Sequence, residues 1–126
     1  MVLENGYKLS VRGGLVEIEQ ENWKPMTPFA NGWKNYSGTY NPAGYFKDSM
    51  CIVHLRGLVK DGATSKHIFI LPAGYRPQHR EIHAVFTRIT PNVHGRVDIK
   101  TNGEILPWPG DKGWTSLDGI TFRAAG

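Results

Sequence analysis

The sequence predicts an all-β domain of antiparallel strands, packed as a β-sandwich or a jelly-roll-like unit. Glycine and proline are frequent, with 15 and 8 copies in 126 residues. Long apolar patterns of helical period are absent, and short alternating segments are separated by turn sequences. A content of 40% hydrophobic and 21% charged residues is typical of a globular protein. A chain of this length can bury a sufficient core without disulfides.

The clearest strand covers residues 50–60, where three aliphatic side chains alternate with three basic ones. This pattern predicts a single half-buried strand. Its buried set is Val53, Leu55 and Val59, and its outward set is His54, Arg56 and Lys60. After Pro77, the alternation of Ile82, Ala84 and Phe86 indicates the entry into a further strand.

Turn sequences divide the remaining chain. Residues 41–44 and 71–74 place proline before Ala-Gly, which favours type I turns. Asx-Gly pairs predict two-residue hairpins, and they occur at Asp61-Gly62, Asn102-Gly103 and Asp118-Gly119. With such hairpins, one face collects Val97, Ile99 and Leu106, and another collects Thr115, Leu117, Ile120 and Phe122, leaving Trp114 and Arg123 opposite.

Composition limits the possible environments and partners. The single cysteine, Cys51, cannot form an internal disulfide, and we expect it to be a small buried apolar residue. No apolar run is long enough for a membrane span, so we expect no membrane insertion. The formal charge of +4 favours acidic partners in general. Because the basic residues are scattered, nucleic acid ranks last among these partners.

A series of landmarks runs from Trp23 to the C-terminus, and in order they read NGWKNY (31–36), YFKD (45–48), VHLRGLVK (53–60), IFILPAGYRP (68–77), GRVDI (95–99) and WTSLDGITF (114–122). Their order and spacing resemble the C-terminal receptor-binding or head domains of tail fibres and baseplate proteins in phages of Gram-positive bacteria. The resemblance implies a homotrimeric β-sandwich at the end of a fibre, on the extracellular side of the virion. It also implies contact with host-surface saccharide or teichoic acid and with the rest of the fibre or baseplate.

The first 22 residues differ in composition from the rest, since they alternate in charge and contain no proline. Within them, residues 9–18 read as two short strands about Gly13-Gly14. We therefore expect residues 1–22 to form an N-terminal hairpin or the end of a fibre shaft, and residues 23–126 to form the head domain.

No sequence motif predicts catalysis. The chain lacks a nucleophile elbow, a phosphate-binding loop and a dinucleotide fingerprint. His79 and His83 have the spacing of a zinc site, but that spacing converges only on a helix, and a strand is predicted here. We expect no metal, no cofactor and no enzymatic activity. The carboxylates expected beside turns or facing outward on strands are Asp48, Asp98, Asp111 and Asp118.

Aromatic residues carry the strongest hint of a binding site, because sugar rings stack on aromatic faces while polar groups bind the hydroxyls. Three segments combine both kinds of residue: 33–36 with Tyr40, 75–80, and 108–114. We expect core or interface packing for Trp33, Tyr36 and Tyr45, and a turn-anchoring role for Tyr75. The candidate ligand-binding residues are Trp108, Asp111, Lys112, Trp114, Arg76, His79 and Arg80, with subunit packing as the alternative for the residues of segment 108–114.

Three interpretations of function follow. The first is a non-catalytic fibre-tip domain that docks on a cell-surface glycan. The second is a structural domain that trimerises and caps a fibre without binding a ligand. The third is a monomeric carbohydrate-binding module of a secreted bacterial protein, which predicts an exposed aromatic platform and no threefold interface.

Overall fold

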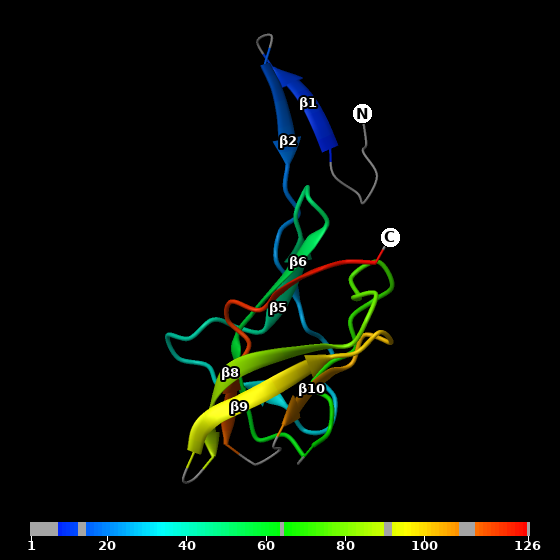
Figure 1. The fold of residues 1–126 in the computed structure, drawn as a ribbon. Helices are drawn as coiled ribbons and strands as arrows, with labels where there is room; N and C mark the ends of the chain where they lie inside the picture. The colour runs from blue at the N-terminus through cyan, green and yellow to red at the C-terminus, as the bar shows by residue number, and fades with distance from the viewer. Residues whose placement is uncertain (1–7, 13–14, 64, 90–91, 109–112, 126) are drawn as a thin grey trace.

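The computed structural model describes residues 8–12, 15–63, 65–89, 92–108 and 113–125, with the backbone alone at 8–12, 15–19, 89 and 92–94. These residues form antiparallel strands and no helix, so they contain no helix that could cross a membrane (Figure 1). The strands are β1 (Lys8–Arg12), β2 (Leu15–Glu19), β3 (Lys24–Pro25), β4 (Lys34–Asn35), β5 (Gly44–Lys47), β6 (Ile52–Arg56), β7 (Leu58–Lys60), β8 (Glu81–Ile89), β9 (Asn92–Ile99), β10 (Ile105–Trp108), β11 (Trp114–Ser116) and β12 (Thr121–Arg123).

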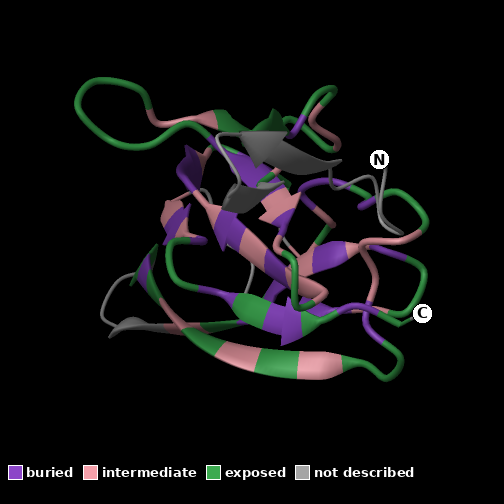
Figure 2. Cartoon of the chain, turned by 90° about the horizontal axis from the view of Figure 1, so that it is seen from above, coloured by how far each residue is buried: buried purple, intermediate pink, exposed green. Residues whose placement is uncertain are grey.

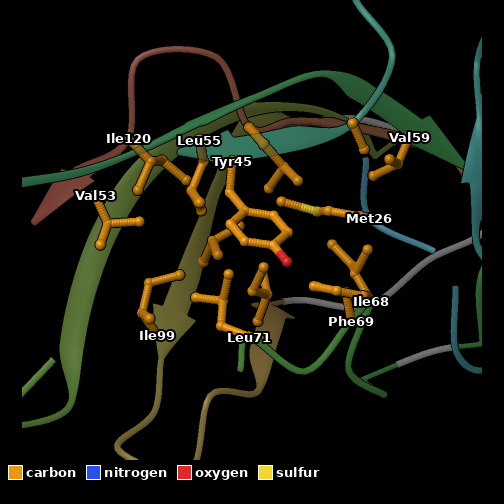
Figure 3. Packing of buried hydrophobic residues seen from close by; sticks show 14 of the residues in the cluster. Met26, Tyr45, Val53, Leu55, Val59, Ile68, Phe69, Leu71, Ile99 and Ile120 are labelled. Atoms are coloured by element: carbon orange, nitrogen blue, oxygen red, sulfur yellow. The ribbon is translucent and has the colours of Figure 1, made fainter. Parts of the chain in front are cut away.

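Two sheets enclose the core. A six-stranded sheet has the order β10-β9-β8-β11-β7-β4, and a four-stranded sheet has the order β12-β6-β5-β3. Tyr45 and Leu55 from the smaller sheet and Ile99 from the larger one meet in a single buried cluster (Figure 3). Buried and exposed residues alternate along several strands, as expected for sheets with one covered face (Figure 2). The prediction of an all-β antiparallel fold is confirmed, and the arrangement is compatible with a β-sandwich.

The N-terminal hairpin is a separate two-stranded sheet. β1 pairs with β2 from Lys8↔Glu19 to Arg12↔Leu15, which confirms the two predicted strands, while Gly13 and Gly14 lie outside the described residues. The chain then joins the body of the domain at Glu21. The Glu21 carboxylate accepts hydrogen bonds from the Lys47 amide (3.0 Å) and the Tyr75 hydroxyl (2.7 Å).

The prediction of one continuous strand over residues 50–60 is wrong, but the residues predicted to be buried are buried. Val53, Leu55 and Val59 are buried, yet the segment breaks at Gly57 into β6 and β7, which belong to different sheets. Gly57 has φ +119°, and its N–H donates to the Asp118 carboxylate at 2.7 Å. The chain therefore passes from one layer to the other at this glycine.

The predicted register of the 102–103 hairpin is wrong by one residue. Gly103 (φ +93°) ends a loop of three residues, since the Lys100 amide donates to the Glu104 carbonyl at 3.0 Å. Ile105 therefore pairs with Ile99, and Leu106 pairs with Asp98 on the opposite face.

The other two Asx-Gly pairs do not form hairpins. Asp61 adopts φ +63°, but the strand before it pairs with β11 and β4 rather than with the next strand in sequence. The side chains around Asp118-Gly119 that were predicted to share a buried face are buried. However, β11 and β12 lie in different sheets, so the turn between them connects the two layers and does not form a hairpin. The face predicted to be shared and found buried is Thr115, Leu117, Ile120 and Phe122.

Of the two predicted proline turns, one forms with a shift and one does not form. The hydrogen-bonded turn runs from Pro72 to Tyr75 (3.1 Å), with Gly74 at φ +92°. Residues 41–44 contain only a bend before β5 begins. Cys51 is also a correction, because it is half-buried rather than fully buried and adopts a left-handed φ of +64°.

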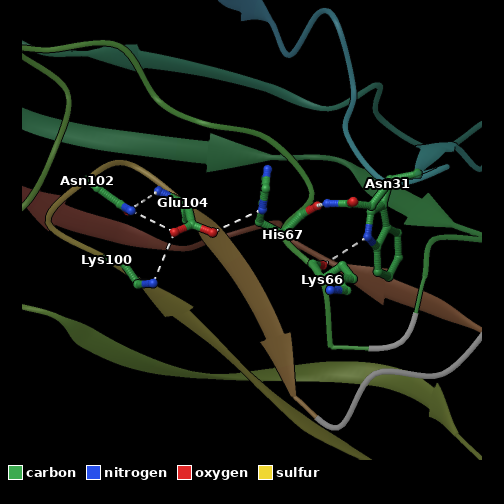
Figure 4. Close-up of polar contacts among 7 residues, drawn as sticks. Asn31, Lys66, His67, Lys100, Asn102 and Glu104 are labelled. Carbon is green, nitrogen blue, oxygen red and sulfur yellow. Dashed lines mark hydrogen bonds and ion pairs between the residues drawn. The ribbon is translucent and has the colours of Figure 1, made fainter.

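Glu104 ties the β9–β10 turn to the loop between β7 and β8 (Figure 4). Its carboxylate accepts hydrogen bonds from the Asn102 amide (2.6 Å) and Lys100 Nζ (3.0 Å) and lies 3.0 Å from His67 Nδ1. The hydrogen bond from Asn102, then that from Lys100, hold the pKa of Glu104 below its usual value. This stabilisation is complete above the ordinary glutamate pKa and is lost as the pH falls through the lowered one.

Candidate functional site

The outer face of the six-stranded sheet carries most of the candidate residues. The register places Ile82, Ala84 and Phe86 of β8 on this face, because Thr87 pairs with Thr115 on the buried side. Trp114 and Ser116 flank Thr115 and therefore face outward beside them. The same alternation brings Leu58 and Lys60 of β7 to the outer face, since they pair with Ser116 and Trp114.

A groove of about 290 Å³ lies on this face. Its walls are largely aromatic, and its polar groups are Ser116 and Asp118. The groove is lined by Tyr36, Tyr40, Leu58, Phe86, Trp114, Ser116 and Asp118. Phe86 is 66% exposed and Tyr40 is 56% exposed, so both rings are open to solvent. Their exposure leaves the ring faces available to a ligand.

The loop 36–43 brings Tyr36 and Tyr40 to the groove. Its backbone is held at both ends, because the Tyr36 amide donates to the Leu58 carbonyl at 2.8 Å and the Leu58 amide donates to the Asn41 carbonyl at 3.1 Å. Between these anchors Ser37 and Gly38 both have positive φ values, of 73° and 71°. The two tyrosine rings meet edge to face with centroids 5.3 Å apart.

Asp118 fastens this loop to the turn after β11. Its Oδ1 accepts hydrogen bonds from the Gly57 amide (2.7 Å) and the Asn41 side-chain amide (3.4 Å). The Leu117 amide in turn donates to the Gly57 carbonyl at 2.8 Å. The Asp118 carboxylate at the edge of the groove is therefore held by Gly57, the residue at which the chain passes from one sheet to the other.

Basic side chains lie beside the aromatic wall. Lys60 Nζ is 4.9 Å from the centroid of the Tyr36 ring, and Lys60 pairs across the sheet with both Trp114 and Lys34. Lys34 forms an exposed ion pair with Asp61 at 3.3 Å. The groove thus combines stacking surfaces, one carboxylate and a neighbouring ammonium group.

Trp108 does not join this groove. It lies on β10, separated from β11 by β9 and β8, and the prediction that it sits in a loop is wrong because it ends the strand. The Arg96 guanidinium lies 5.7 Å from the Trp108 ring centroid. The five predicted ligand residues that the structure describes are therefore dispersed rather than gathered.

Arg80 is engaged with a buried carboxylate. Asp98 pairs with Ile82 and so faces outward on its strand as predicted, but it is only 1% exposed. Its Oδ2 lies 2.7 Å from Arg80 Nη2, and its Oδ1 accepts from Arg96 Nε at 3.0 Å. Leu106, opposite Asp98 in the register, is half-buried beside this pair. Both arginines are thus available to a ligand only through their exposed edges.

The remaining predicted residues lie elsewhere. Arg76 is half-buried and its Nε donates to the Leu71 carbonyl at 2.7 Å. His79 is exposed in the loop before β8, while His83 lies within β8, 3.2 Å from Glu81. Asp111 and Lys112 lie outside the described residues. Among the residues that the structure describes, no group of three or more His, Cys, Asp or Glu side chains is arranged to hold a metal ion.

Two of the other carboxylates lie beside turns as predicted. Asp118 precedes Gly119, and Asp48 accepts hydrogen bonds from the Met50 (2.8 Å) and Ile52 (3.0 Å) amides. Burial raises the pKa of Asp48, but the hydrogen bonds from His54 and from these two amides outweigh it and lower the pKa overall.

Comparison with known proteins adds nothing to this geometry. No family model matches the chain. The curated proteins and the solved structures likewise gave no match.

Sequence reasoning found part of the groove and missed part. Trp33 and Tyr45 are buried in the core as predicted, with the Trp33 indole donating to the Lys66 carbonyl at 3.2 Å. Tyr36, by contrast, is half-exposed and stacks at the groove. Phe86 was recognised as part of a strand but not as a site residue. The signal that identifies it is its place in the triplet Ile82, Ala84 and Phe86, an apolar strip that the structure leaves exposed.

Proposed function

We propose that this chain is a non-catalytic receptor-binding domain at the tip of a phage-type tail fibre, which docks on a cell-surface saccharide or teichoic acid. The observation that carries the proposal is the groove in which Tyr36, Tyr40, Phe86 and Trp114 present aromatic faces beside polar groups. Sugar rings are bound by this combination of stacking and hydrogen bonding. The virion surface is the location that follows from this role.

The composition of the groove favours binding over hydrolysis. A glycosidase places two carboxyl groups about 5 to 9.5 Å apart across the scissile bond. Asp118 is the one carboxylate among the described lining residues, and its Oδ1 is held by the Gly57 amide. The neighbouring Lys60 suits a ligand that carries phosphate or carboxylate groups. A non-catalytic glycan site is the simplest use of these groups.

Removing the exposed ring of Tyr40 should weaken glycan binding about 5-fold to 150-fold, since one stacked ring contributes roughly 1 to 3 kcal/mol. Tyr40 lies in a loop and is 56% exposed, so Tyr40→Ala should leave the fold intact. Binding of purified protein to Gram-positive cells and to isolated teichoic acid measures the effect.

Trp108→Ala is the matched control, because it removes an exposed aromatic ring of the same sheet face outside the groove. Unchanged binding by Tyr40→Ala, together with a large loss in Trp108→Ala, would move the site to β10 and overturn the groove assignment.

A trimeric form of the domain is the second part of the proposal. The apolar strip of β8 extends beyond the groove at Ile82 and Ala84, which are exposed, with Ile82 at 63%, and contiguous exposed apolar residues mark interaction surfaces. Three linked copies would convert weak single contacts into useful avidity. If the strip is used in this way without glycan binding, the domain is a structural cap of the fibre.

Light scattering on a size-exclusion column should give about 42 kDa, which is three times the chain mass of 14.1 kDa. Ile82→Glu should return the protein to the monomer mass, because it places a charge in the subunit contact. Met50→Glu, at a residue that is 75% exposed and far from β8 in sequence, should not. A monomer of the unaltered chain at high concentration would favour a monomeric carbohydrate-binding module instead.

A further inference from the structure

A second hollow, of about 520 Å³, opens between the two sheets, away from the aromatic groove. It is lined by side chains from three parts of the chain: Cys51 before β6, the loop residues Gln78 and His79 with Glu81 at the start of β8, and Arg123 at the end of β12. A volume of this size lies within the range of small-ligand sites.

The backbone around this hollow is fixed. Pro77 and Ala124 form an isolated bridge between the loop before β8 and the segment after β12. The Ala125 amide donates to the Arg76 carbonyl at 2.8 Å, and the Ala124 amide donates to the Cys51 carbonyl at 2.9 Å. Three segments distant in sequence are thus held around one opening.

Three of the polar side chains that line the hollow are not used by the fold. In the part of the chain that the structure describes, the side chains of Gln78, His79 and Arg123 make no hydrogen bond or ion pair. Arg80 and Arg96, by contrast, are both paired with Asp98. Three side chains with hydrogen-bond donors therefore line the hollow and remain available to bind a ligand.

Cys51 lines the same hollow and has a left-handed backbone conformation. Its φ of +64° is uncommon for a residue with a side chain, and such strain is frequent at ligand sites. The strain and the convergence of free donors are independent observations at one location.

We propose that this hollow binds a monosaccharide-sized ligand that carries one anionic group, either a carboxylate or a phosphate. The Arg123 guanidinium and the Gln78 and His79 side chains supply donors to the anion, and arginine matches the planar geometry of both groups. Glu81 carries the charge opposite to that of Arg123; one of its carboxylate oxygens lies 3.2 Å from His83 Nε2, and the other accepts hydrogen bonds from ligand hydroxyls. The site is distinct from the groove of Tyr40 and Trp114 and does not depend on it.

The test is an NMR titration of the full chain with glucose 6-phosphate, glucuronate and glucose, followed at the side-chain signals of Arg123 and His79. We expect at least one of the two anionic sugars to bind with a Kd of about 1 mM, and glucose about tenfold or more weaker. The tighter of the two anions identifies phosphate or carboxylate as the preferred group.

Arg123→Gln should abolish the preference for the anionic sugar over glucose, whereas Arg88→Gln, at an exposed arginine outside the hollow, should preserve it. Tyr40→Ala should also preserve it, which separates this site from the proposed glycan groove. Equal binding of all three sugars, no binding at about 20 mM, or an unchanged preference in Arg123→Gln would overturn the proposal.

Discussion

Replacing Gly57 with alanine should destabilise the domain by about 3 to 5 kcal/mol, a large part of the stability of a domain of this size. Gly57 has φ +119°, which side-chain-bearing residues rarely adopt. A methyl group at this position would contact the Ala43 Cα and lie 2.6 Å from the Ala43 amide nitrogen and 2.9 Å from the Pro42 carbonyl carbon. These are backbone atoms, so relief of the clash requires β5 and β6 to move.

Gly38→Ala is the matched control. Gly38 also has a positive φ, of 71°, but an added methyl group there would have no atom within 4 Å. We expect this variant to lose only about 1 kcal/mol, the cost of the left-handed conformation alone. Urea denaturation followed by tryptophan fluorescence measures both values. Equal losses in the two variants would show that Gly57 is needed only for its φ and not for close packing between the layers.

The sequence was a sound guide to which side chains are buried. Alternation identified Val53, Leu55 and Val59 as core residues, and all three are buried. This succeeds because burial depends on a local period of two, which each strand displays by itself. The burial of Phe122 after Asp118-Gly119 was predicted on the same basis.

Strand partners could not be predicted in the same way. The pattern of residues 50–60 continues through Gly57, but pairing with β5 and β12 on one side and with β11 and β4 on the other places its halves in different layers. Such pairing is a long-range property, and local turn sequences do not encode it. The register error at Asn102-Gly103 has a smaller cause, a single extra loop residue.

The candidate site shows the same division. Trp114 and Tyr36 each belong to a segment selected for its aromatic and polar composition, yet they meet only because β11 and β4 both pair with β7. Trp108 belongs to the same segment as Trp114 and is carried to the far side of β9. Composition therefore selected suitable side chains, and topology decided which of them form a groove.

Removal of both Arg80 and Arg96 should have the second large effect, a loss of about 3 to 5 kcal/mol, because it leaves the Asp98 carboxylate buried without a counter-ion. Asp98 is 1% exposed, and within the described residues its carboxylate accepts side-chain hydrogen bonds from the guanidinium groups of Arg80 and Arg96. Either single variant, Arg80→Gln or Arg96→Gln, should cost only about 1 kcal/mol, since the remaining arginine still neutralises the charge.

The double-mutant cycle built from these variants should therefore be strongly non-additive. Lys34→Gln provides the control, because the Lys34–Asp61 pair has side-chain exposures of 61% and 45% and should contribute less than about 0.5 kcal/mol. Denaturant midpoints of the four proteins in the cycle and of the control measure the coupling. Additive losses would mean that water reaches Asp98 once either arginine is shortened, so that burial of the carboxylate depends on both side chains together. A coupling of about 2 kcal/mol or more would instead show that β9 and the loop before β8 hold the carboxylate buried by themselves, and that the arginines serve to neutralise it.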